Sequence, residues 1–380
     1  IIDADLIGRP KHRFPNLASM KISGYHKSNG DNVVLKQDYS NLHNYDIVYI
    51  SKVFTDTPVP KDILQLKNVK YGGTGFFYDK APFLPDEIEH HMPDYNLYDE
   101  WVKQQLNNGV KQKDLKYYTD YSIGYTTRFC FRGCKFCVNQ NYKKVEKWSP
   151  LSEFVDYNKP KICLLDDNMF GCKDWKQILL ELQETNKPFQ YKQGLDERLL
   201  TEEKIKLLFS SKYDGDFIFA FDNINDAELI ENKLKLIRQN YRNKGQNIKF
   251  YVLCAFDERE KNEDEEIKKQ AYTENFWAED IKNTFERIKL LMKYNCLPYI
   301  MRYEQYNNSP YYGTYVNLAS WCNQPNMFKK KSYRQWCIDD NKRKGGNSAT
   351  IRYLKQFEND YPNIAKQYYD MKFEELNQSI

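Results

Sequence analysis

The sequence lacks any apolar run long enough to cross a membrane, and it has no internal repeat and no long low-complexity segment. Its first residues also lack the charged and then apolar pattern of a secretory signal. The chain begins Ile-Ile-Asp without a methionine, so we expect some N-terminal residues to be missing. We therefore expect a cytoplasmic protein that does not enter the membrane.

The chain also has little net charge for its size. Its 57 Lys and Arg residues nearly balance its 53 Asp and Glu residues, which leaves a formal charge of +4 spread along the sequence. Such a balance neither demands nor excludes a nucleic-acid partner. With 380 residues the chain is long enough to form two or three domains.

Nine cysteines are present, but only three are clustered, and no second Cys-x2-Cys pair accompanies them. This usage fits a reducing cytoplasm better than a disulfide scaffold. The clustered residues are Cys130, Cys134 and Cys137, spaced Cys-x3-Cys-x2-Cys. The intervening Gly133 allows the backbone to turn tightly before the second thiol.

Two kinds of metal site fit this spacing. A [4Fe–4S] cluster is normally held by four thiolates, so three local thiolates would leave one iron open to another ligand. A structural zinc site needs four ligands, and here Cys163 or Cys172 would have to supply the fourth. The missing second cysteine pair favours the iron–sulfur site.

The cysteine loop resembles that of the radical SAM enzymes. The resemblance implies that the amino and carboxylate groups of S-adenosylmethionine chelate the open iron. It also implies that an electron cleaves the sulfonium to a 5′-deoxyadenosyl radical. The aromatic residue before the last cysteine, here Phe136, would lie near the adenine. The implied partners are S-adenosylmethionine, an external one-electron reductant of the flavodoxin or ferredoxin type, and an unidentified substrate.

The first part of the sequence predicts a small parallel, Rossmann-like α/β unit over residues 1–115. Short apolar strands are expected at 1–5, 46–51 and 69–75, with a helix at 15–30. This order resembles the cobalamin-binding-type domain that precedes many radical SAM cores. The segment has no Asp-x-His-x-x-Gly motif, but the resemblance implies that this absence decides little. The segment is also short for such a domain, and for this reason we expect a degenerate domain without bound cobalamin.

From about residue 116 to 305, strands alternate with helices. Strands are predicted at 122–127, 161–165, 189–193, 216–221, 249–255 and 297–302, and the clearest helices at 174–184, 201–211, 226–240 and 281–294. The pattern resembles the partial (β/α)6 TIM-type barrel of radical SAM cores, whose chemistry gathers at the C-terminal ends of the strands. Residues 306–380 are expected to form a helical C-terminal cap.

Polar residues at these strand ends are candidates for binding S-adenosylmethionine. Asp167 and Asn168 follow the second strand, where the resemblance implies contact with the methionyl amine. This chain lacks the Gly-Gly-Glu often found there, and helix capping is an equal alternative. Asp222 closes the fourth strand and is a candidate for a ribose or substrate contact.

The third and fifth strands supply further candidates. Arg198 would pair with the methionyl carboxylate as a bidentate fork, while Gln193 or Asp196 would hold the ribose hydroxyls. A solvated ion pair is the alternative for Asp196 and Arg198. Leu253 would line the adenine through its backbone, although a core strand explains it nearly as well.

The sequence therefore predicts a radical SAM enzyme, an oxidoreductase or transferase, that abstracts hydrogen from an unidentified substrate. One alternative is a cobalamin-dependent radical SAM methyltransferase. Another is a non-catalytic module that binds metal or nucleic acid. Cys322 and Cys337 are too few for an auxiliary cluster. The sequence names neither the substrate nor the oligomeric state.

Overall fold

The computed structural model describes residues 1–241 and 245–377. They form a mixed α/β protein with parallel sheets, as predicted. The chain is divided into two compact units, Ile1–Lys192 and Gln193–Ile380. The domain boundaries expected at 115/116 and 305/306 stay predictions. Every helix in the described residues is too short or too polar to cross a lipid bilayer.

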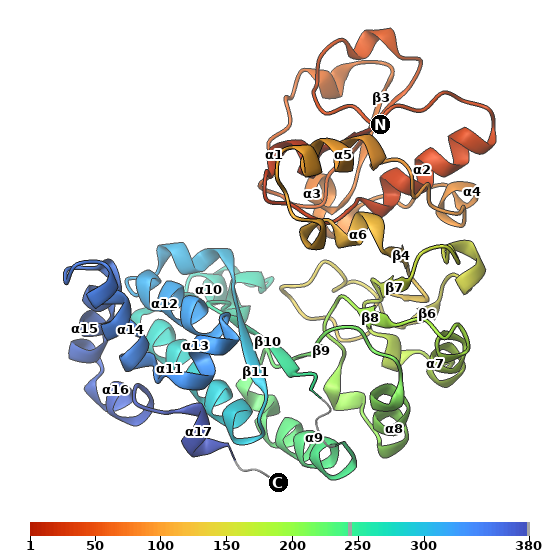
Figure 1. The fold of residues 1–380 in the computed structure, drawn as a ribbon. Helices are drawn as coiled ribbons and strands as arrows, with labels where there is room; N and C mark the ends of the chain where they lie inside the picture. The colour runs from red at the N-terminus through yellow and green to blue at the C-terminus, as the bar shows by residue number, and fades with distance from the viewer. Residues whose placement is uncertain (242–244, 378–380) are drawn as a thin grey trace. The chain divides into compact units, whose positions relative to one another are not determined.

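The first unit contains two three-stranded parallel sheets and a short antiparallel pair (Figure 1). The first sheet has the order β1-β2-β3 and the second the order β4-β7-β8. The strands are β1 (Ile2–Asp3), β2 (Val48–Ser51), β3 (Val69–Gly72), β4 (Tyr121–Gly124), β5 (Thr127–Arg128), β6 (Glu146–Lys147), β7 (Lys161–Leu164) and β8 (Phe189–Tyr191). The α-helices are α1 (Ala4–Gly8), α2 (Leu17–Ser28), α3 (Thr74–Phe77), α4 (Asp86–Glu89), α5 (Asp99–Asn107), α6 (Lys116–Thr119) and α7 (Trp175–Glu184).

Local sequence explains several of these elements. The side chain of Asn16 accepts the backbone N–H of Ser19 at 3.0 Å and so begins α2 within the predicted range.

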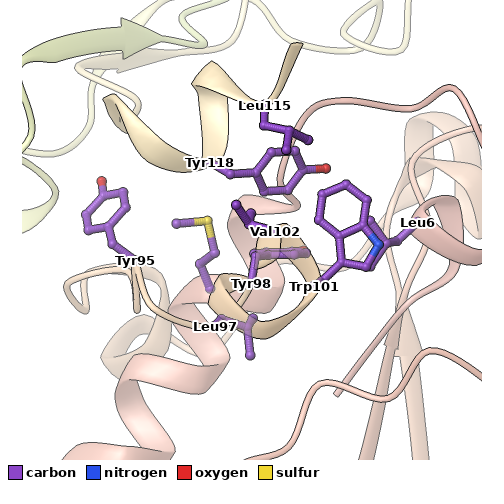
Figure 2. Close-up of a cluster of buried hydrophobic side chains, with 9 residues drawn as sticks. Leu6, Tyr95, Leu97, Tyr98, Trp101, Val102, Leu115 and Tyr118 are labelled. Atoms are coloured by element: carbon purple, nitrogen blue, oxygen red, sulfur yellow. The ribbon is translucent and has the colours of Figure 1, made fainter. Parts of the chain in front are cut away.

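A cluster of buried apolar side chains joins α5 and α6 to the N-terminal segment (Figure 2). Its labelled members are Leu6, Tyr95, Leu97, Tyr98, Trp101, Val102, Leu115 and Tyr118.

The second unit contains one three-stranded parallel sheet and a set of helices. The sheet has the order β11-β10-β9, made of β9 (Phe217–Ala220), β10 (Ile248–Cys254) and β11 (Leu297–Arg302). Its helices are α8 (Glu202–Ser210), α9 (Ala227–Asn240), α10 (Glu265–Lys268), α11 (Glu274–Lys293), α12 (Tyr312–Cys322), α13 (Pro325–Lys330), α14 (Tyr333–Arg343), α15 (Ala349–Asp360), α16 (Pro362–Tyr368) and α17 (Phe373–Leu376). The region after 306 is helical (Figure 1), with α16 and α17 against α11 and with α12 against β11 and α15.

One helix begins earlier than the sequence predicted. Helix α11 begins at Glu274 rather than at 281, because Thr273 caps it by accepting the N–H of Phe276. Trp277 and Ala278 then extend the buried face toward Ile281. The predicted start missed this cap, which precedes the apolar run.

The six strands predicted for a barrel are all present, but they are arranged as two groups of three. Among the described residues no sheet exceeds three strands and no closed barrel is present. An isolated parallel bridge joins Leu195 to Phe219 of β9, so β9 has an extended neighbour besides β10. The Rossmann and partial-barrel assignments stay predictions.

Candidate functional site

The cysteine loop lies between β5 and β6, directly after β4 of the first unit. The two short strands pair antiparallel, Thr127 with Lys147 and Arg128 with Glu146, and so close the base of the loop. Cys130, Cys134 and Cys137 are all partly exposed, unlike the other six cysteines, which are buried. The three thiols are therefore accessible on one short, closed loop.

Two left-handed residues shape the loop. Gly133 has φ +62°, as its predicted role in a tight turn requires. Phe129, immediately before Cys130, has φ +73°, which is rare for a bulky side chain. Its ring stacks on Tyr142 at 4.1 Å between ring centres and meets the edge of Trp148. Packing on both rings holds Phe129 in this strained conformation.

Asp166, at the end of β7, anchors the start of the loop. Its carboxylate accepts the backbone N–H and the hydroxyl of both Thr126 and Thr127, at 2.5–2.9 Å. Burial raises the pKa of Asp166 to about 6, although these hydrogen bonds oppose the shift. This carboxylate positions the backbone that leads from β4 to the loop.

The next two residues, Asp167 and Asn168, contact the loop itself, while their predicted contact with the methionyl amine stays a prediction. Asp167 accepts the backbone N–H of Phe129 at 2.8 Å, and burial raises the pKa of its carboxyl group. The side-chain amide of Asn168 donates to the sulfur of Cys130 at 3.3 Å. The end of β7 thus contacts the first cysteine and the residue before it.

The capping alternative for Asp167 and Asn168 is wrong. Asn168 precedes the 3-10 helix η6 (Met169–Gly171), but its side chain makes no capping hydrogen bond there. Asp167 uses its carboxylate on Phe129 instead. These side chains therefore serve the cysteine loop rather than the following helix.

The far side of the loop is held by residues that the sequence analysis missed. Tyr78 donates its hydroxyl hydrogen to the carbonyl of Phe136 at 2.8 Å. Asp79 accepts from the side chains of Gln140 at 3.0 Å and Asn141 at 2.9 Å. All lie in the first unit, but about sixty positions separate Tyr78 and Asp79 from their partners, so no local pattern in the sequence reveals them.

The donor set of the loop suits a thiolate-bound metal or cluster. The loop offers three thiols, and amide groups donate to two of them, Asn168 to Cys130 and the backbone N–H of Asn139 to Cys137 at 3.4 Å. Hydrogen bonds to sulfur are a normal feature of iron–sulfur sites. Within the described residues, however, no three His, Cys, Asp or Glu side chains are arranged to hold a metal ion. The metal ligands therefore stay a prediction.

The cysteines weighed as a fourth zinc ligand or an auxiliary cluster lie in the interior. Cys163 is within β7 and Cys172 follows η6, and both are buried. Burial raises the pKa of the Cys172 thiol, which disfavours the thiolate that zinc requires. Cys322 and Cys337 are also buried, with pKa values raised by desolvation.

The remaining predicted residues belong to the second unit. Gln193 is exposed, whereas Asp196 is buried and its carboxylate accepts from Nε of Arg198 at 2.7 Å. Nη1 of Arg198 also donates to Asp226 at 2.9 Å. The ion pair weighed as the alternative is therefore formed, but it is largely buried rather than solvated, and it involves a third residue, Asp226. A methionyl carboxylate at Arg198 would have to share the guanidinium with these two carboxylates.

Asp222 and Leu253 are brought together at the ends of β9 and β10. The carboxylate of Asp222 accepts the backbone N–H of Leu253 at 3.0 Å, and burial raises its pKa. Arg287, another residue that the sequence analysis missed, donates from Nη1 to the carbonyls of Asp222 and Leu253, each at 2.8 Å. Both backbone groups of Leu253 are thus already engaged.

A further missed residue is Glu197, which opens the 3-10 helix η7 (Glu197–Leu199). Its side chain is 1 % exposed, and Oε2 accepts the N–H of Ala220 at 3.2 Å. Oε1 has no hydrogen-bond partner among the described residues, and Nε of Arg198 is 3.9 Å away. Burial raises the pKa of this carboxyl to about 8.

Neither a protein-family model nor a curated protein matches this chain.

Proposed function

We propose that the protein is a radical SAM enzyme, with the finer fold that this implies: a degenerate Rossmann-like domain, a partial (β/α)6 barrel and a helical cap. The observation that carries the proposal is the Cys-x3-Cys-x2-Cys loop, placed after β4 and contacted by the end of β7 through Asn168 and Cys130. Cys130, Cys134 and Cys137 would hold a [4Fe–4S] cluster. When bound and reduced, such a cluster supplies the electron that cleaves the sulfonium of S-adenosylmethionine to methionine and a 5′-deoxyadenosyl radical.

The chain's own residues then have distinct roles. Asp166, Tyr78 and Asp79 hold the two ends of the loop, so the thiols sit on a supported segment. Asp167 adds a carboxylate next to Cys130 that suits the positively charged methionyl amine. Phe136 is the candidate for the adenine contact.

The residues predicted to bind the ribose and the methionyl carboxylate all belong to the second unit, and these contacts stay predictions. Gln193 is exposed and stays a candidate for the ribose, as do the buried carboxylate of Asp196 and the partly buried carboxylate of Asp222. Arg198 would supply the cation. The backbone contact predicted for Leu253 on the adenine side would have to share groups that already bond to Asp222 and Arg287. The bridge between Leu195 and Phe219 supports the barrel part of the proposal, because the chain after β8 runs as an extended neighbour of β9.

The test is anaerobic reconstitution of the full chain with iron and sulfide. We expect about four irons per chain, held as one cluster. With S-adenosylmethionine and dithionite as the electron donor, we expect release of 5′-deoxyadenosine and methionine, measured by mass spectrometry. Flavodoxin or ferredoxin would replace dithionite in a second assay.

Single substitutions of cysteine distinguish this proposal from the alternative of a non-catalytic module that binds zinc or nucleic acid. Cys134→Ala should lose most of the iron and all 5′-deoxyadenosine formation. Cys322→Ala, a buried cysteine in α12, is the matched control and should retain its iron. A full cluster in the Cys134→Ala protein, or a chain that binds zinc and takes up no iron, would rule the proposal out.

A further inference from the structure

A pocket lined mainly by cationic side chains lies in the first unit, formed by residues that the proposed function does not use. It has a volume of about 510 Å³ and is built from the segments 11–13 and 109–117. Its cations are Lys11, Arg13, Lys111, Lys113 and Lys116. Although these residues are far apart in sequence, folding gathers them around one hollow.

The charge of this pocket is not neutralised by the protein. Asp114 is the one carboxylate in its lining, which leaves an excess of four positive charges. That equals the formal net charge of the whole chain. None of the five cations forms an ion pair within the described residues. The pocket therefore favours an anion.

The fold explains why the cations face outward. Leu115 and Tyr118 are buried in the apolar cluster of Figure 2, where they lie beside Trp101 and Val102. The lysines at 111 and 113, which come just before Leu115, are consequently left exposed. Buried neighbours thus hold the cationic segment in place without neutralising it.

The opposite wall of the pocket is also held in place. Nη1 of Arg13 donates to the carbonyls of Pro10 at 2.8 Å and His12 at 2.6 Å, which fixes the turn that carries Lys11. The N–H groups on Nη1 of Arg13 therefore stabilise the turn, while the positive charge of the guanidinium still contributes to the pocket. The site is thus built from two braced segments rather than from isolated surface lysines.

The aromatic ring in the lining does not offer a face for a nucleobase. Tyr117 packs against Phe14 at 4.8 Å and stacks on Tyr121 at 4.9 Å between ring centres. Nζ of Lys192 lies 4.4 Å from the centre of the same ring and 3.1 Å from its hydroxyl. Lys192 adds a sixth cation beside the pocket. The ligand is therefore recognised by its charge.

We propose that this pocket binds a compact ligand carrying two or more adjacent phosphate groups. Two phosphate groups carry about −3 to −4 at pH 7, which matches the excess charge of the lining. A pocket of this volume falls in the range of small-ligand sites. S-adenosylmethionine carries no phosphate, so this ligand is a different one, and the lining of its pocket contains no residue of the cysteine loop.

The test is calorimetric titration of the full chain with tripolyphosphate at low salt. We expect one site, weaker binding of inorganic phosphate, and an affinity that falls as salt is raised. Lys111→Gln/Lys113→Gln should weaken binding by about tenfold or more, since each change removes a charged hydrogen-bond donor. Both side chains are exposed, so the fold should survive, which circular dichroism would check.

The matched control is Lys61→Gln/Lys67→Gln, which removes the same charge from two exposed positions elsewhere in the first unit. It should bind tripolyphosphate normally. Equal weakening in both variants, or no binding by the unaltered chain, would overturn the proposal. The last experiment titrates a short single-stranded RNA in place of tripolyphosphate. RNA binding that tripolyphosphate does not displace would also overturn the proposal, because the ligand would then be a nucleic-acid backbone.

Discussion

The carboxylate of Asp167 accepts the backbone N–H of Phe129 at 2.8 Å, and this bond connects the end of β7 to the residue before Cys130. Phe129 is held at φ +73°, so its N–H points where an ordinary strand residue would not place it. Asp167 therefore has two separable properties, an acceptor that positions the loop and a charge that suits the methionyl amine.

Two substitutions at Asp167 separate these properties. Asp167→Asn retains an oxygen that accepts from Phe129 but removes the negative charge. If the charge binds the methionyl amine, affinity for S-adenosylmethionine should fall about tenfold to a hundredfold, since a charged hydrogen bond contributes roughly 1.5–3 kcal/mol. Titration calorimetry on the reconstituted protein measures this directly.

Asp167→Ala is the companion variant, because it removes both the charge and the acceptor. It should weaken S-adenosylmethionine binding at least as much and also lower the iron content, since Phe129 loses its anchor. Normal affinity in Asp167→Asn together with impaired Asp167→Ala would leave Asp167 a positioning residue only. The binding role would then move to Gln193, Asp196 and Arg198.

Sequence reasoning found the parts of the molecule that depend on local pattern. The strands of both units were recognisable as short apolar runs, and β10 alternates buried and part-buried residues along its length. The cysteine loop was recognisable because its three thiols lie within eight positions of each other. The turn at Gly133 was predictable because glycine adopts left-handed conformations easily, and its φ of +62° agrees with that prediction.

The rest depends on contacts between distant segments, which a single sequence does not display. Nothing near Tyr78 indicates that its hydroxyl reaches the carbonyl of Phe136. The burial of Glu197 is equally invisible, because Asp-Glu-Arg is an ordinary surface tripeptide by composition. The cationic pocket escaped notice because lysines at 11 and 111 are separated by a hundred residues.

The amide of Asn168 gives a prediction about the electronic properties of the proposed cluster. A hydrogen bond to a ligating sulfur stabilises the additional negative charge of the reduced form. Asn168→Ala removes the bond to Cys130 and should make the reduction potential more negative. A redox titration followed by electron paramagnetic resonance measures the shift. Asn141→Ala, whose side chain donates to Asp79 rather than to sulfur, should leave the potential unchanged.

The left-handed conformation of Gly133 gives a prediction about loop formation. Gly133→Ala should cost roughly 1–2 kcal/mol of folding free energy, because the added Cβ is strained at positive φ. Its nearest heavy-atom contact is the carbonyl oxygen of Gln140 at 3.6 Å, an ordinary distance, so strain rather than collision is the cause. Urea unfolding and iron uptake are the measurements.

Gly30→Ala is the control for this strain. Gly30 has φ +86° with nothing within 4 Å of its added Cβ, so the conformational cost should be similar. Iron uptake should fall in Gly133→Ala alone. A similar loss of iron in both variants would mean that lowered stability, rather than the shape of the cysteine loop, controls cluster assembly.

The last prediction concerns the buried carboxyl of Glu197 and the pH dependence of stability. Its pKa is raised from the ordinary 4.5 to about 8 in the folded protein, with burial as the largest cause. The folded state therefore holds this proton more tightly than the unfolded state. The protonated carboxyl therefore contributes to the free energy of unfolding. This contribution is fully present below pH 4.5 and is lost as the pH rises through about 8.

Glu197→Gln should remove this dependence, because its amide oxygen can still accept from Ala220 and the group no longer titrates. Between pH 5 and pH 8 the unaltered protein should lose up to about 4 kcal/mol from this group, at roughly 1.4 kcal/mol per pKa unit. The variant should lose markedly less, as measured by urea unfolding at the two pH values. Glu202→Gln is the control, since Glu202 is an exposed residue at the start of α8 and should leave the dependence intact. Parallel pH profiles for the unaltered protein and Glu197→Gln would show that Glu197 does not retain its proton in the fold.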